Sequence, residues 1–183
     1  MDEDDFEREL YQLATHEAGH AVVAWSLGFD IESVSIVADG EYRGRTRIIA
    51  PTRLNSFRRM EPVIQRCRTL EKRVRICFAG PLAEGRFAGE ALHEIAAQND
   101  FQQGVLLLRG VAETHAEREK IGDFLFRKTQ ALVARRWKEI NLLARNLVAN
   151  EELFSEDVDA LLGARRLEYF SRNSISDATP QVI

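Results

Sequence analysis

His16, Glu17 and His20 form the pattern H-E-x-x-H near the start of the chain. In a helix, side chains four positions apart lie one above the other, with their Cβ atoms about 5–6 Å apart. Two imidazoles at this spacing can bind one Zn²⁺ ion. In this pattern the glutamate carboxylate faces the metal-bound water and serves as its general base. We therefore predict that His16 and His20 ligate zinc and that Glu17 is the base.

A catalytic zinc site needs a third protein ligand and one open position. A histidine six residues after the second motif histidine would be one solution, but Ser26 stands there. The acidic or imidazole side chains that remain as candidates are Glu84, His93, Glu94 and Asp100. Their spacing alone does not choose between them.

The elements that position these residues are predicted mainly as helices, because apolar residues recur at a helical period. The predicted helices cover residues 5–27, 61–85 and 100–149, with a last short helix that ends at Gly163. The pair Gly80-Pro81 predicts a kink or a new start inside the second of them. We expect the third segment to form two helices that meet near residues 120–122. Residues 86–99 are predicted as a loop or a short helix.

Two segments after the first helix are predicted as the strands of a β-hairpin, residues 31–37 and residues 42–50. The second strand carries Arg43, Gly44, Arg45 and Arg47. These residues could line an edge that pairs with an extended peptide, or protect that edge by their charge. The predicted fold class is mainly α (α+β), one domain over residues 1–166 with a flexible tail over 167–183.

Composition and motif searches exclude several classes of protein. The 183 residues carry a formal charge of −4, which gives no support to a nucleic-acid partner. No apolar run is long enough to cross a bilayer, the N-terminus is acidic, and no phosphate-binding loop or G-x-G-x-x-G motif occurs. Cys67 and Cys77 lie ten residues apart in one predicted helix and cannot bridge each other. We therefore expect a reduced, cytoplasmic protein without membrane insertion.

Several segments resemble the peptidase domain of the FtsH-type membrane AAA zinc metalloproteases. The run T-H-E-A-G-H-A-V-V-A at residues 15–24 looks like the zinc-motif helix of that family. The run A-G-P-L-A-E at 79–84, followed by Gly89-Glu90, is similar to the family block A-G-R-A-A-E-E-L-x-F-G-E. Asn99-Asp100 resembles the family segment S-N-D-L, and residues 131–162 are similar to its closing helices. The resemblance extends over about residues 10–163.

This resemblance implies a set of functional residues and a cofactor. His16, His20 and Asp100 correspond to the three zinc ligands of the family, and Glu17 to its base. Glu84 matches a family glutamate near the site, which we expect to orient a ligand. The sequence departs from the family in three ways. The family's ATPase and membrane segments are missing. Residues 94–98 replace the threonine and glycines that precede the ligand aspartate in the family, and the segment between residues 100 and 129 is shorter than the family's.

The sequence thus predicts a zinc-dependent metalloendopeptidase that cleaves unfolded or loosely folded polypeptides by a metal-activated water, without an ATPase of its own. A non-catalytic, zinc-binding adaptor or regulator is the alternative. The intact Glu17 favours the enzyme, since a scaffold does not need a base there. A homo-oligomer or a separate unfoldase as partner is compatible with either function.

Overall fold

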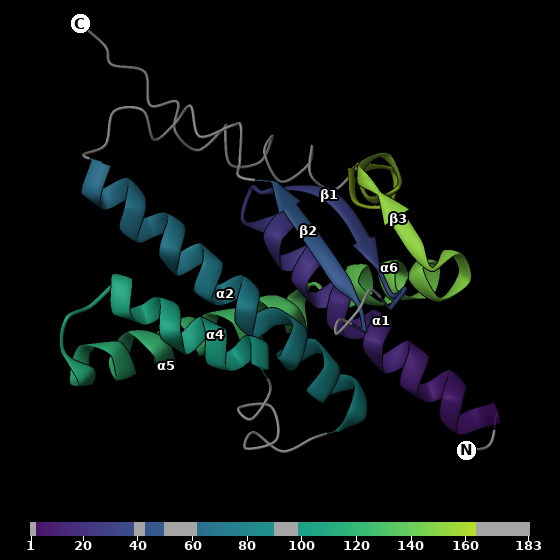
Figure 1. Cartoon of the computed structure of the whole chain (residues 1–183), viewed down its shortest axis with the longest axis horizontal. Helices are drawn as coiled ribbons and strands as arrows, with labels where there is room; N and C mark the ends of the chain where they lie inside the picture. The colour runs from purple at the N-terminus through teal and green to yellow at the C-terminus, as the bar shows by residue number, and fades with distance from the viewer. Residues whose placement is uncertain (1–2, 39–42, 50–61, 90–98, 164–183) are drawn as a thin grey trace, which may run out of the picture.

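The chain is mainly helical and carries a small antiparallel sheet, as expected (Figure 1). A computed structural model describes residues 3–38, 43–49, 62–89 and 99–163. Its elements in chain order are α1 (Glu3–Ser26), β1 (Asp30–Ser35), β2 (Arg45–Ile49), α2 (Pro62–Ala88), α4 (Asn99–Leu107), the 3₁₀ turn η2 (Leu108–Gly110), α5 (His115–Arg135), α6 (Trp137–Asn150) and β3 (Glu152–Phe154). Residues 155–163 are again helical, as predicted.

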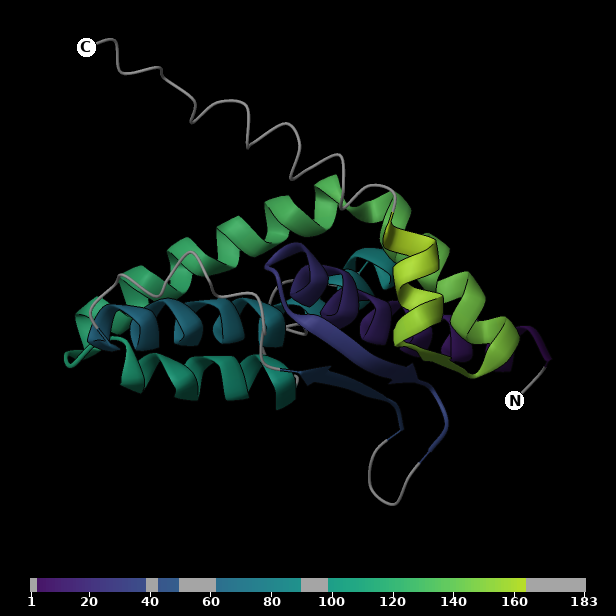
Figure 2. The ribbon, with the colours of Figure 1, turned by 90° about the horizontal axis from the view of Figure 1, so that it is seen from above.

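Helix α5 lies on one side of the molecule, and α4 and the sheet lie on the other (Figure 2). Between them, α1 and α2 lie side by side and run in opposite directions (Figure 1). Their contact depends on small residues. Ala18 and Ala83 are fully buried, and a Cβ at Gly19 would lie only 2.7 Å from Cβ of Ala83. Because Gly19 has no side chain, the two backbones approach closely at the centre of the histidine motif.

Within the described residues, the three strands form one sheet in the order β2-β1-β3, with both pairs antiparallel. The central strand β1 buries Ile31 and Val34 against the helices. Val34 pairs with Thr46 on β2 and with Leu153 on β3. The predicted hairpin is confirmed by β1 and β2, and β2 lies at an edge of the sheet. The third strand was not predicted from the sequence.

Of the two outcomes predicted at Gly80-Pro81, a kink or a new start, the new start is wrong, because α2 is one helix from Pro62 to Ala88 with Pro81 in its interior. An interior proline costs a helix about 3 kcal/mol, since it removes a backbone hydrogen bond and clashes with the preceding turn. The neighbouring residues Ala79, Leu82 and Ala83 are 0–4% exposed. Burial of this face against the rest of the core offsets the cost of the proline.

The predicted helix junction near residues 120–122 is also wrong, because these residues lie inside α5. The chain breaks instead at residues 111–114 and turns again at Arg136. Thr114 and Glu117 form a capping box that begins α5: the Thr114 hydroxyl accepts from the Glu117 backbone N–H, and the Glu117 carboxylate accepts from the Thr114 N–H. This capping places the break before His115.

Other predictions concern parts of the chain that the structure does not describe. Residues 90–98, which hold most of the predicted loop, and the predicted tail at 167–183 lie outside the described residues. None of the described helices combines the length and the apolar character that crossing a membrane requires.

Candidate metal centre

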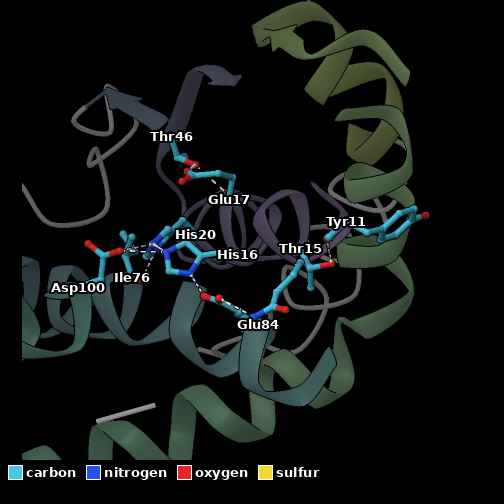
Figure 3. A network of polar contacts seen from close by, with 10 residues as sticks. Tyr11, Thr15, His16, Glu17, His20, Thr46, Ile76, Glu84 and Asp100 are labelled. Atoms are coloured by element: carbon cyan, nitrogen blue, oxygen red, sulfur yellow. Dashed lines mark hydrogen bonds and ion pairs between the residues drawn. The ribbon is translucent and has the colours of Figure 1, made fainter. Parts of the chain in front are cut away.

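His16, His20 and Asp100 converge at the place where α4 begins beside α1 (Figure 3). The Nε2 atoms of the two histidines lie 3.0 Å apart, and Asp100 Oδ2 lies 2.9 Å from His16 Nε2 and 3.3 Å from His20 Nε2. Ligand atoms about 2.0–2.1 Å from one tetrahedral ion are separated from each other by about 3.3 Å. The three atoms therefore have the spacing of one face of such a coordination sphere.

The opposite ring nitrogens of both histidines are held by acceptors. His16 Nδ1 lies 2.6 Å from Glu84 Oε2, and His20 Nδ1 lies 2.8 Å from the carbonyl oxygen of Ile76. With Nδ1–H donating to these oxygens, a neutral imidazole presents the lone pair of Nε2 toward the cluster. The Gln12 amide in turn donates to Glu84 Oε1 at 2.9 Å. Both α1 and α2 thus orient the rings for metal binding.

Charge in this cluster also suits a cation. Burial by itself lowers the pKa of His16, but its hydrogen bonds to Asp100 and Glu84 raise that pKa to about 9. His16 likewise holds the pKa of Glu84 below its usual value, against the effect of burial. Hydrogen bonds from His16 and His20 hold the pKa of Asp100 well below its usual range. A proton on His16 therefore sits between carboxylates in the metal-free chain, where a bound cation would replace it.

Glu17 lies beside this cluster and makes a separate contact. Its side chain is buried, and its carboxylate Oε2 accepts a hydrogen bond from the Thr46 hydroxyl at 2.7 Å (Figure 3). Glu17 lines a cavity of about 280 Å³ together with His20, Asp100 and residues of β2. Glu17 therefore faces the same cavity as two of the predicted zinc ligands.

The structure brings together five of the residues singled out from the sequence: His16, Glu17, His20, Glu84 and Asp100. Glu84 contacts Nδ1 of His16, the ring nitrogen that points away from the cluster, and its orienting role stays a prediction. The other two candidates for a third ligand, His93 and Glu94, lie outside the described residues. The ligand roles themselves stay predictions.

Residues that sequence reasoning missed complete the site. Thr46 of β2 and Gly44, just before that strand, lie against Glu17, and Gly80 of α2 packs against the two imidazoles. Gly44 was assigned to the strand edge and Gly80 to a break in the helix. The A-G-P-L-A-E run was the one signal that could have placed Gly80 in the site. Nothing in the local pattern singled out Thr46.

Comparison with known proteins gives two partial matches. The chain is 34% identical over 107 residues to the ATP-dependent zinc metalloprotease FtsH of Ureaplasma parvum serovar 3. The matched segment covers 57% of this chain and 14% of that protein. The chain is also 30% identical over 129 residues to the ATP-dependent zinc metalloprotease FtsH 1 of Thermomicrobium roseum. That match covers 69% of this chain and 18% of the relative. No family model matches the chain.

These matches relate part of the chain to the FtsH zinc metalloproteases at a distance. The chain spans less than a fifth of the length of either relative. The similarity therefore supports a relation to a protease family that is zinc-dependent.

Proposed function

We propose that this chain is a zinc-dependent metalloendopeptidase domain that hydrolyses peptide bonds in unfolded or loosely folded polypeptides. The observation that carries the proposal is the convergence of His16, His20 and Asp100 beside an intact Glu17. His16 and His20 would hold the metal through Nε2, and Asp100 through Oδ2. The partial similarity to zinc metalloproteases supports the same chemistry.

Zinc bound at this centre supplies a Lewis acid and lowers the pKa of a bound water toward ~7. Glu17 accepts the proton of the attacking water and can return it to the leaving amine. Glu84 and the carbonyl of Ile76 keep the two imidazoles in the orientation and tautomer that the ligand role requires. In this proposal Glu17 moves the proton, and Glu84 and the Ile76 carbonyl orient the imidazoles.

The edge strand β2 would bind the polypeptide. It pairs with β1 along one side, and its residues Arg45, Thr46 and Ile48, with the preceding Gly44, line the cavity next to Glu17 and His20. A strand at a sheet edge can pair with an extended segment through main-chain hydrogen bonds, which suits substrates of varied sequence. A compact protein cannot present such a segment, so we expect folded substrates to resist cleavage. We expect ATP to have no effect, because the sequence carries no phosphate-binding loop.

The test compares the purified chain with its Glu17→Gln variant. We expect both to bind zinc in near one-to-one ratio, and only the unmodified chain to cleave an unfolded protein such as casein. A chelator should abolish the cleavage and zinc should restore it. Undiminished cleavage by Glu17→Gln contradicts the mechanism. Stoichiometric zinc without any cleavage by the unmodified chain would favour a non-catalytic adaptor.

A further inference from the structure

Thr46 of the edge strand β2 contacts Glu17 at two oxygen atoms. Its hydroxyl lies 2.7 Å from Glu17 Oε2 and 3.1 Å from the backbone carbonyl oxygen of Glu17 (Figure 3). A hydroxyl has one proton to donate, and the shorter contact directs it mainly to the charged carboxylate. Among the residues that the structure describes, Thr46 is the one hydrogen-bond donor to this carboxylate.

Gly44, two residues before Thr46, provides the room that the other carboxylate oxygen needs. A Cβ at position 44 would lie 2.9 Å from Glu17 Oε1 and 3.0 Å from Glu17 Cγ, closer than real Cβ contacts allow. Alternate residues of an extended chain face the same side, so Gly44 and Thr46 both face Glu17. The chain segment around β2 therefore binds Oε2 through Thr46 and packs against Oε1 with the bare backbone of Gly44.

We propose that Thr46 is a positioning residue for the base: its hydrogen bond to Oε2 fixes the rotation of the Glu17 carboxylate and leaves Oε1 as the oxygen that accepts a proton. A glutamate side chain has several rotatable bonds, and a base acts only within hydrogen-bond reach of its proton. This inference rests on the proposed function and deepens it. The strand that would bind the polypeptide is also the element that orients the base.

The test replaces Thr46 by valine, which removes the hydroxyl and keeps the shape of the side chain. We expect Thr46→Val to lower kcat about 10–100-fold, the cost of a base displaced by about 1 Å, and to leave KM and zinc affinity within about twofold. Thr46→Ser retains the donor and should recover most of the activity. The matched control is Thr129→Val, whose lost hydroxyl donates at 2.8 Å to Leu125 of its own helix α5.

Two activity outcomes would overturn the inference. A Thr46→Val chain with unchanged kcat shows that the hydroxyl does not position the base. A Thr46→Val chain that loses zinc affinity in proportion to kcat shows that Thr46 supports the metal centre or the fold instead. Circular dichroism and zinc titration on each variant separate these two results.

A structural readout tests the orientation of Glu17 separately from catalytic activity. In crystals of the metal-free chain, we expect one position for the Glu17 carboxylate, and a displaced or multiple position in Thr46→Val and in Gly44→Ala. An unchanged Glu17 side chain in both variants would overturn the positioning role. A chain that binds zinc but cleaves nothing contradicts the proposed function, and the crystals then still decide the role of Thr46.

Discussion

The backbone of Gly80 faces Nε2 of His20 so closely that a side chain at position 80 would overlap this nitrogen. A Cβ there would also lie 2.7 Å from Nε2 of His16. The helix α2 thus meets the two imidazoles with bare backbone. The absence of a side chain at this single position leaves the space in which the ligand atoms of the candidate metal centre converge.

Gly80→Ala should therefore remove metal binding while the chain stays folded. In an ordinary helix interior this change stabilises the fold by about 0.5–1 kcal/mol. Here the added methyl group must displace His16 and His20, and we expect zinc affinity to fall by more than about tenfold in a chelator competition assay. The control is Gly122→Ala on α5, where a Cβ would meet the flexible end of Leu108 at 3.0 Å. Unchanged zinc affinity in Gly80→Ala would contradict the geometry.

Asp100 and Glu84 should differ in their effect on zinc affinity. Asp100→Ala removes one of three proposed ligand atoms, whereas Glu84→Ala removes the acceptor that orients His16. Loss of such an orienting group costs about 10–100-fold in affinity or activity, and loss of the ligand should cost more. Zinc titration of both variants measures the order, with the exposed Asp123→Ala on α5 as control. A larger loss in Glu84→Ala than in Asp100→Ala would reverse the assignment.

The sequence predicted the helix α1 and the placement of its histidines because both depend on local spacing. A period of 3.6 residues defines the buried face of α1, and a spacing of four positions from His16 to His20 places the rings on one side. The approach of Asp100, 84 residues further along than His16, depends on how α4 packs against α2. Spacing left Asp100 as one of four candidates, and the family resemblance selected it.

The parts that sequence reasoning missed depend on contacts between distant segments. Thr46 contacts Glu17 across 29 positions in the chain, and the short strand β3 exists because Leu153 pairs with Val34. Three residues carry too little periodicity to indicate a strand. The junction before α5 was the one error with a local cause, because the Thr114–Glu117 capping box was present in the sequence and was not used.

That capping box should contribute measurably to stability. Thr114→Ala removes the acceptor for the Glu117 backbone N–H, and we expect the free energy of unfolding to fall by about 1 kcal/mol. Glu117→Gln keeps an acceptor of the same shape and should have a smaller effect. Urea denaturation followed by circular dichroism measures both. A Thr114→Ala chain as stable as the unmodified one would mean that α5 does not depend on this cap.

Cys77 should be an unusually unreactive thiol, although it lines the same cavity as His20 and Asp100. Burial, and then the negative charge of Asp100, raise the pKa of Cys77 to about 11, against the opposing effect of Arg73. Only the thiolate reacts, so alkylation should accelerate about tenfold per pH unit between pH 7 and pH 10 in a Cys67→Ser chain. Mass spectrometry of iodoacetamide-treated protein measures this rate.

In concentrated urea the increase in the alkylation rate of Cys77 should level off near pH 8.5–9, the ordinary range of a thiol. The same plateau in the folded chain would contradict the burial of Cys77.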